Sequence, residues 1–330
     1  MNPTLIEWLQ NPDGSKGFTW NPVSGCSKVS DGCKHCYAEV YANRFWGGRK
    51  FTDIKCHDEK LAEPLKREKP TRVFVNSMSD LFHPDVPFEF IDKVFAVMAL
   101  AHQHTFMILT KRPERMVEYF QGYPFARVEA LMDGPAWVVL PSGRAFPRFI
   151  NAFPLPNVYL GVSVEDQKTA DERIPLLLQT PAATRFVSYE PALGPVDFSR
   201  IGKALFDRKK VIKACMNGPA AMQADAQIAY PELDWIIAGG ESGPKARPSH
   251  PDWFRSARDQ CKAAEVPFFF KQWGEWGPGW EFARAATVDR ETGETQYPGL
   301  FGDKEDVMFK KGKKKAGSLL DGVEYKEFPL

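Results

Sequence analysis

The stretch "RVFVNSMSD" (residues 72–80) passes from a short apolar run directly into a polar turn. Near-continuous apolarity over so few residues is typical of a parallel strand that is buried on both faces. Further runs follow the same plan, so the sequence predicts an α/β fold. They are "TFMILTKRP" (105–113), "NVYLGVSVED" (157–166), "TRFVSYEP" (184–191), "DWIIAGGESG" (234–243) and "VPFFFKQW" (266–273).

Helical patterns separate these runs. One begins at Asp85 and Pro87 and another at Ser249 and Pro251, and each continues with apolar residues near helical spacing. With a first strand expected at "FTWNP" (18–22), the runs suit a partial or complete (β/α) barrel of the TIM type. A doubly wound open sheet would give the same alternation, so the periodicity leaves both topologies open.

Composition limits the class of protein further. The chain has 330 residues and a formal net charge of +1, so no global field attracts it to nucleic acid or anionic lipid. It contains no apolar run of about 18 residues and no leader pattern, which favours a cytoplasmic protein without a membrane partner. We expect a single domain over 1–330, with insertions at 121–156 and 199–232 and a polar C-terminal extension from about residue 277.

The polar residues of each run stand at its C-terminal end. Both topologies gather their ligand site there, because the loops converge at that edge of the sheet. Polar residues that simply end a buried strand are the alternative explanation. The residues are Ser77, Ser79 and Asp80; Thr110, Lys111 and Arg112; Ser163 and Glu165; Ser188 and Glu190; Glu241 and Ser242; and Lys271 and Gln272.

A loop near the N-terminus, "GCSKVSDGCKHCYAE" (25–39), carries Cys26, Cys33 and Cys36 in the spacing C-x6-C-x2-C. Structural zinc usually takes four protein ligands, whereas a four-iron cluster held by three thiolates keeps one iron open for chemistry. The ligand count favours the iron–sulfur cluster. Zinc with His35 or His57 as the fourth ligand, and unligated thiols, remain alternatives. The other cysteines, Cys56, Cys215 and Cys261, are widely separated in the sequence, so we predict no second cluster.

Together with "VNSMSDLFH", "LTKRPERM", "IIAGGESG" and "FFKQWGEW", this loop resembles the three-cysteine radical-SAM-like family of bacteria and their phages, described as a domain of unknown function. The resemblance covers most of the chain. It implies a barrel, often incomplete, whose first loop binds a 4Fe–4S cluster, with S-adenosylmethionine on the open iron. The commonest loop of radical SAM enzymes is C-x3-C-x2-C with an aromatic residue before the last cysteine, where this chain has His35.

The resemblance also implies roles for the strand ends. Capping of a following helix is the alternative role for Ser77, Asp80 and Glu165. The expected cofactor ligands are Ser77 and Asp80 for the amino group, Lys111 and Arg112 for the carboxylate, Ser163 and Glu165 for the ribose, and Gly239, Gly240 and Glu241 for the adenine or a substrate phosphate. The expected catalytic residues are Glu190, Lys271 and Gln272.

The predicted function is that of a radical SAM enzyme, which cleaves S-adenosylmethionine reductively to a 5′-deoxyadenosyl radical with the help of an electron donor. Basic runs make a nucleotide, DNA or RNA the candidate substrate, for modification or repair. The alternatives are a zinc- or cluster-stapled nucleic-acid-binding protein without radical chemistry, and a cluster used for electron transfer. The runs comprise Arg208, Lys209 and Lys210, and Lys310, Lys311, Lys313, Lys314 and Lys315.

Overall fold

The computed structural model describes residues 1–133, 154–201, 232–278, 285–296 and 307–329. The chain forms two compact units, each assembled from segments that are distant in sequence. The first comprises Met1–Val29, Cys36–Val162 and Gln179–Arg185, and the second comprises Ser30–His35, Ser163–Leu178 and Phe186–Leu330. Most of the two predicted insertions, including the basic run at 208–210 and Cys215, lies outside the described residues.

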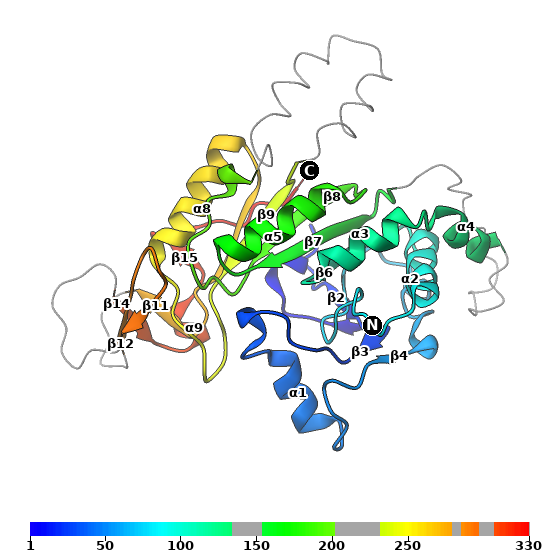
Figure 1. Ribbon diagram of the computed structural model, residues 1–330, viewed down its shortest axis with the longest axis horizontal. Helices are drawn as coiled ribbons and strands as arrows, with labels where there is room; N and C mark the ends of the chain where they lie inside the picture. The colour runs from blue at the N-terminus through cyan, green and yellow to red at the C-terminus, as the bar shows by residue number, and fades with distance from the viewer. Residues whose placement is uncertain (134–153, 202–231, 279–284, 297–306, 330) are drawn as a thin grey trace, which may run out of the picture. The chain divides into compact units, whose positions relative to one another are not determined.

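The strands that follow the predicted runs build a mostly parallel eight-stranded sheet in the order β1-β2-β5-β6-β7-β8-β9-β10 (Figure 1). From β2 onward this order follows the chain without reversal, as in a (β/α) barrel, whereas a doubly wound sheet reverses at a switch point. The predicted fold class is confirmed. The strands are β1 Asn2–Pro3, β2 Phe18–Trp20, β5 Arg72–Val75, β6 Thr105–Thr110, β7 Val158–Val164, β8 Thr184–Tyr189, β9 Trp235–Gly239 and β10 Phe268–Gln272.

Burial explains why these runs form strands. In β5, Val73, Phe74 and Val75 are all buried, although successive side chains point to opposite faces of a sheet. All five residues of β9 are buried as well. The prediction of strands covered on both faces is therefore confirmed, and the sheet brings the C-terminal ends of the runs to one edge.

In the first unit, α2 (Phe88–Leu100) and α3 (Pro113–Gln121) begin next to prolines, as the helical pattern predicted for α2. The carboxylate of the buried Asp92 accepts hydrogen bonds from the Tyr119 hydroxyl at 2.9 Å and from Arg127 Nε at 2.7 Å. Burial, followed by the charge of Asp92, raises the pKa of Tyr119 far above its ordinary value. The remaining elements are α1 Tyr37–Phe45, α4 Phe125–Asp133, β3 Val23–Ser24 and β4 Lys55–Cys56.

In the second unit, α5 (Gln167–Leu178) is capped by Asp166, whose Oδ1 accepts a hydrogen bond from the Thr169 backbone N–H at 2.8 Å. The helix α8 (Pro251–Ala264) is capped by His250 and packs against β9 and β10. Its last turn ends at Glu265 in the left-handed conformation. The predicted helix after Pro251 is thereby confirmed.

The C-terminal part holds more structure than the polar extension that the sequence predicts. It contains a four-stranded antiparallel sheet, β11-β14-β12-β13, and the hairpin β15-β16. Residues after this hairpin run along β10, where the Phe270 backbone N–H donates to the Tyr325 carbonyl at 2.9 Å. The elements are β11 Trp276–Pro278, β12 Ala285–Val288, β13 Thr295–Gln296, β14 Val307–Lys310, α9 Lys313–Ala316, β15 Leu319–Leu320 and β16 Val323–Glu324.

No helix within the described ranges is both long and apolar enough to cross a membrane.

Candidate functional site

The base of the cysteine loop is fixed by backbone contacts within the first unit. Gly25 has a φ of 101°, and a Cβ at this position would lie 2.5 Å from the Asp53 carbonyl oxygen. The next residue, Cys26, donates its backbone N–H to the Phe51 carbonyl at 2.8 Å. Glycine is therefore required before Cys26 because two backbone segments approach closely there.

The thiols of Cys26 and Cys36 are partly buried, and both residues pack against a small apolar cluster. The cluster consists of Ala38, Ala42 and Phe51, with Trp46 and Met78 at its side. The first and third cysteines of the loop thus share one hydrophobic support, which excludes water from one side of each thiol.

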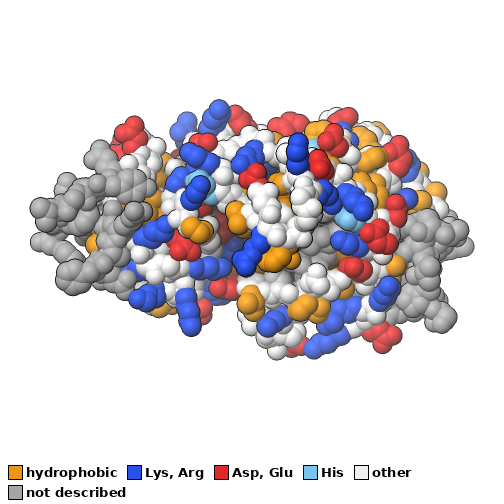
Figure 2. Space-filling view, turned by 90° about the horizontal axis from the view of Figure 1, so that it is seen from below, with side chains coloured by type: hydrophobic (Ala, Val, Ile, Leu, Met, Phe, Trp, Pro, Cys, Tyr) orange, Lys and Arg blue, Asp and Glu red, His pale blue; other side chains and the backbone are white. Residues whose placement is uncertain are grey.

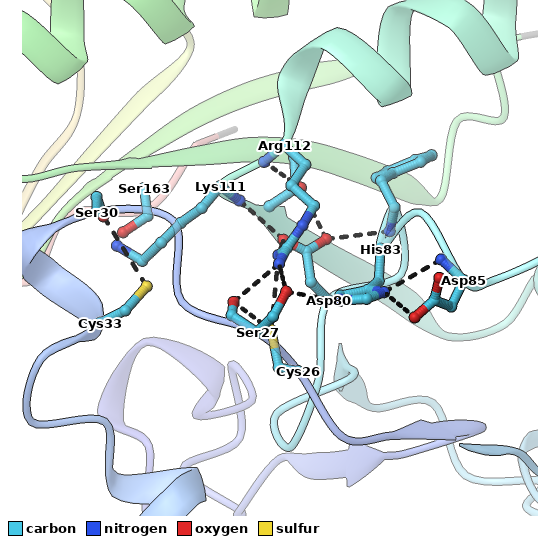
Figure 3. A network of polar contacts seen from close by, with 12 residues as sticks. Cys26, Ser27, Ser30, Cys33, Asp80, His83, Asp85, Lys111, Arg112 and Ser163 are labelled. Carbon is cyan, nitrogen blue, oxygen red and sulfur yellow. Dashed lines mark hydrogen bonds and ion pairs between the residues drawn. The ribbon is translucent and has the colours of Figure 1, made fainter. Parts of the chain in front are cut away.

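A buried ion pair also contacts the loop (Figure 3). Arg112 Nη1 donates to Asp80 Oδ2 at 3.0 Å and to Cys26 Sγ at 3.6 Å. Arg112 Nη2 donates to the carbonyl and the hydroxyl of Ser27, at 2.8 and 2.9 Å. Burial alone would lower the pKa of Arg112, but the charges of Asp80 and Cys26 outweigh it and raise that pKa. The guanidinium therefore stays charged and stabilises a thiolate at Cys26.

Both carboxylate oxygens of Asp80 accept hydrogen bonds within the protein. Its Oδ1 accepts from the Thr110 hydroxyl at 2.8 Å and from the Phe82 backbone N–H at 3.0 Å, and its Oδ2 also accepts from the Lys111 backbone N–H at 3.1 Å. The ends of β5 and β6 are thereby tied together. Because α2 begins only at Phe88, Asp80 does not act as the helix cap that the sequence offered as an alternative.

His83 supports the same network. Its Nε2 lies 2.8 Å from Ser27 Oγ, and its Nδ1 accepts from the Asp85 backbone N–H at 3.2 Å (Figure 3). Burial, and then the charge of Arg112, lower the pKa of His83, so the imidazole is neutral at pH 7. Sequence reasoning missed Ser27 and His83, since neither stands at a strand end.

Ser77 lies at the end of β5 but outside this network. Its hydroxyl donates to Asn21 Oδ1 at 3.1 Å, and its carbonyl accepts a hydrogen bond from the Tyr37 hydroxyl. Like Asp80, Ser77 is too far from Phe88 to cap α2. Its assignment as a cofactor ligand stays a prediction.

In the second unit, the predicted catalytic pair does meet. Lys271 Nζ lies 2.7 and 2.9 Å from the two carboxylate oxygens of Glu190, and the side chains are 17% and 19% exposed. Ser163 donates its hydroxyl to the Glu190 carbonyl at 3.0 Å, and a Cβ on Gly239 would lie 3.5 Å from Glu190 Oε1. The C-terminal ends of four strands therefore converge on a partly exposed ion pair.

Gln272 is the third predicted catalytic residue. It follows Lys271 in β10, and its side chain is buried. Its Nε2 donates to Ser242 Oγ at 2.9 Å, whereas its buried Oε1 has no hydrogen-bond partner among the described residues. A buried acceptor without a donor is costly, so this oxygen suits a donor group of a ligand. Glycine is required at position 240, because a Cβ there would lie 2.0 Å from the Trp273 carbonyl oxygen.

Glu165 supports the loop segment that carries Cys33, which also belongs to the second unit. Its carboxylate lies 3.2 Å from Arg173 Nη1 and accepts a hydrogen bond from the Ser30 hydroxyl at 3.0 Å. A Cβ on Gly32 would lie 2.4 Å from Glu165 Oε1, so the glycine makes room for this carboxylate. Since Asp166 caps α5, the capping alternative for Glu165 is wrong.

A second carboxylate fixes the same segment through an arginine. Glu241 accepts hydrogen bonds from Arg247 Nη2 at 2.8 Å and Nε at 2.9 Å, and Arg247 Nη2 also donates to the Asp31 carbonyl at 3.0 Å. Ser30, Arg173 and Arg247 were not predicted. Arg247 and Asp31 are separated by 216 residues, so no local pattern reveals the contact.

The loop's suitability for a metal centre depends on its donor atoms. In the described ranges no group of three or more His, Cys, Asp or Glu residues is placed to hold a metal ion, and none of Cys26, Cys33 and Cys36 forms a disulfide there. Thiolates are the ligands that 4Fe–4S clusters prefer, and Arg112 supplies charge compensation at Cys26, so the donor set fits such a cluster.

The zinc alternative loses one of its two histidines. Both ring nitrogens of His57 are engaged, Nε2 with Ser24 Oγ at 2.8 Å and Nδ1 with Glu59 Oε1 at 2.9 Å. The imidazole is buried, and burial lowers its pKa. His57 is therefore a support of β3 and β4 and is not available as the fourth ligand.

Comparisons with known proteins give a family and distant structural neighbours. A model of the family described as "Protein of unknown function (DUF5131)" matches residues 3–329. A spore photoproduct lyase complexed with dinucleoside spore photoproduct is 9% identical, with 96% of this chain and 74% of that chain covered and a TM-score of 0.39. A mutant spore photoproduct lyase is 11% identical, with 84% and 69% covered and a TM-score of 0.36. A search of curated proteins found no match.

Proposed function

The chain belongs to this family of unknown function, and we propose that it is a radical SAM enzyme that acts on a nucleotide or nucleic acid, in modification or repair. The observation that carries the proposal is the environment of the cysteine loop. A buried guanidinium donates to the first thiol, and the segment with the second thiol is anchored by Glu165 at the end of β7 and by Arg247 in the loop after β9.

Cys26, Cys33 and Cys36 would hold a 4Fe–4S cluster, whose fourth iron is left open because the loop offers three thiolates. When bound and reduced by an electron donor, such a cluster supplies the electron that cleaves S-adenosylmethionine to methionine and a 5′-deoxyadenosyl radical. The protein's part is to orient the ligands and exclude water. Arg112 contributes by offsetting the negative charge at Cys26.

The buried polar residues support the loop in this proposal. Asp80, Arg112 and Glu165 are each at most 7% exposed, and hydrogen bonds within the protein occupy their polar groups. Direct contact with S-adenosylmethionine, which the resemblance implied for them, would require these bonds to break. We therefore assign them a positioning role.

Direct contact with ligands falls to the strand ends around the partly exposed pair of Lys271 and Glu190. The Lys271 ammonium suits a carboxylate or a phosphate, and Glu190 suits a hydroxyl or amino donor. The unpartnered Oε1 of Gln272 would accept a hydrogen bond from a ribose hydroxyl or an amine. Lys111, Ser163, Ser77 and the turn Gly239–Gly240 stay in the proposal as further cofactor contacts.

The test is anaerobic reconstitution of the full chain with iron and sulfide. We expect about four irons per chain, a brown protein, and release of 5′-deoxyadenosine when dithionite and S-adenosylmethionine are added. The variant Cys33→Ala should release none. The matched control Cys56→Ala removes a half-buried thiol outside the loop and should behave as the wild type.

Two results would overturn the proposal. Equal release from Cys33→Ala would separate the loop from the chemistry. A colourless protein that retains zinc and never releases 5′-deoxyadenosine would favour a stapled nucleic-acid-binding protein instead.

A further inference from the structure

In the helix α1, which follows the third cysteine directly, the small residues are buried and the large apolar residues are exposed. Its buried face consists of the small residues Ala38 and Ala42. Its large apolar residues point to solvent instead: Tyr37, Val40, Tyr41 and Phe45 are 60%, 65%, 51% and 57% exposed. An amphipathic helix normally places its large apolar residues against the core.

This exposure is concentrated on one helix face. The four residues have the spacing i, i+3, i+4 and i+8, which aligns them along one side of a helix. They are four of the nine large hydrophobic residues that are exposed in the described part of the chain. An apolar patch of this kind on a monomer indicates a binding surface. We call Tyr37, Val40, Tyr41 and Phe45 the α1 face.

Aromatic rings dominate the α1 face, and each of these side chains is more than half exposed. The Tyr41 and Phe45 rings have centroids 4.6 Å apart with an interplanar angle of 43°. The Arg44 guanidinium lies 5.1 Å from the Phe45 centroid, and the Arg49 guanidinium lies 4.0 Å from that of Trp46. Rings interleaved with guanidinium groups offer planar surfaces on which bases stack.

The charge around the α1 face is positive. Glu39 is paired with Lys28 at 2.8 Å, so the acidic residue of the helix is neutralised. Arg44, Arg49 and Lys50 follow, and Arg44 and Lys50 are exposed. Figure 2 shows that hydrophobic side chains are exposed among charged side chains of both signs on the side of the molecule that it draws.

The backbone after the helix is also accessible. Gly47 and Gly48 have φ values of 59° and 89°, and a Cβ on either would meet nothing within 4 Å. A phosphate can therefore approach the main chain beside Lys50 without displacing a side chain.

We propose that the α1 face is the docking surface for a single-stranded nucleic acid, whose bases stack on Tyr41 and Phe45 and whose phosphates contact Arg44 and Lys50. This inference names the substrate class of the proposed function. It rests on that function, because the bound nucleic acid would be the substrate of the enzyme. Charge complementarity selects a polyanion, and the aromatic rings favour unpaired bases over an acidic protein surface.

The test measures binding of fluorescein-labelled 15-mers of DNA and RNA to the reconstituted full chain by fluorescence anisotropy, without reductant. The double variant Tyr41→Ala/Phe45→Ala should bind at least about 5- to 140-fold more weakly, the range that follows from the loss of one stacked base. Wild-type affinity should fall steeply with salt. The matched control Tyr123→Ala removes a 77% exposed aromatic residue elsewhere in the first unit and should bind as the wild type.

Three outcomes would overturn the proposal: no binding by the wild-type chain, equal binding by the double variant, or an effect of the same size in Tyr123→Ala. The double variant could instead bind oligonucleotides normally but lose self-association, or be reduced more slowly by an acidic flavoprotein. Either result would overturn the proposal and assign the α1 face to that other partner. Circular dichroism checks the fold, which substitutions at exposed sites leave intact. Release of 5′-deoxyadenosine is measured separately, so failure of the radical chemistry and failure of docking are distinguishable.

Discussion

At the scale of single residues, the pair of Asp80 and Arg112 links the cysteine loop to the sheet. Both side chains are buried, and Arg112 also holds the carbonyl of Ser27. Breaking a buried pair by removing one partner leaves an uncompensated charge, which costs about 3–5 kcal/mol. We expect Asp80→Ala to lower the free energy of unfolding of the cluster-free chain by that amount, as measured by urea denaturation.

A matched double variant tests this cause. Asp80→Leu combined with Arg112→Met removes both charges, so it should recover at least half of the lost stability. Two results would contradict this explanation: a loss of less than about 1 kcal/mol in Asp80→Ala, or a loss in the double variant as large as that of both single changes together. Either would mean that an uncompensated buried charge is not the cause of the lost stability.

Residue patterns predicted both members of the Asp80–Arg112 and Glu190–Lys271 pairs, but only one member of the other site contacts. Asp80, Arg112, Glu165 and Glu241 stand at strand ends, where the apolar runs stop, and were predicted for that reason. The partners that were missed include Ser27, Ser30 and Arg247, which lie in loops with no periodicity, and Arg173, which lies within α5. Ser30, for example, binds Glu165 across 135 residues of sequence, a contact that depends on the tertiary fold alone.

At the scale of elements, the hairpin β15-β16 is fastened to α8 by Asp321. This residue has a φ of 54°, and its carboxylate accepts hydrogen bonds from Arg255 at 2.8 and 2.9 Å and from Arg258 at 2.8 Å. The hydrogen bond from Arg255 outweighs partial burial and lowers the pKa of Asp321, and Arg258 lowers it further. The ionised form is therefore favoured in the folded chain.

The lowered pKa fixes the direction of the pH dependence. A depressed folded-state pKa gives stability that is fully present above the unfolded pKa of about 3.9 and is lost as pH falls through the folded value. We expect Asp321→Asn, which tolerates the left-handed backbone, to cost about 1 kcal/mol at pH 7. In urea titrations the difference from the wild type should shrink below about pH 4. A difference that stays constant down to pH 2 would rule out the carboxylate as its source.

The strands were easier to predict than the C-terminal elements. A parallel strand such as β9 is apolar throughout, so its signal lies within five residues. In contrast, β14 (Val307–Lys310) pairs antiparallel with β11 and β12, and its neighbours in sequence are polar. Its apolar run is too short to be told from an isolated surface patch, and the sequence therefore predicted only an extension.

At the scale of the whole molecule, the C-terminal residues complete the second unit. The ring of Phe328 lies 5.4 Å from that of Trp235 and 5.3 Å from that of Phe269, and Trp235 Nε1 donates to the Glu327 carbonyl at 2.9 Å. The isolated bridge between Phe269 and Lys326 shows that this segment lies antiparallel along β10. It covers a strand that would otherwise be an edge.

Removal of residues 325–330 should therefore expose the edge of β10 and the aromatic rings beside it. We expect the shortened chain to lose about 1–3 kcal/mol through the loss of the partly buried Phe328 alone and to aggregate through the uncovered strand. Light scattering after size-exclusion chromatography measures the aggregation, and urea denaturation measures the loss of stability. Deletion of residues 1–3, which removes the two-residue strand β1 from the other end of the sheet, is the control. A shortened chain that stays monomeric and as stable as the control would contradict the expectation.

The position of Tyr325, Lys326 and Glu327 along β10 also has a consequence for synthesis. A ribosome makes the chain from the N-terminus, so β10 emerges while the residues that cover it are still unmade or inside the exit tunnel. The sheet of the second unit thus stays incomplete until Tyr325, Lys326 and Glu327 have left the exit tunnel. Until these hydrogen bonds form, a chaperone has a bare strand to recognise.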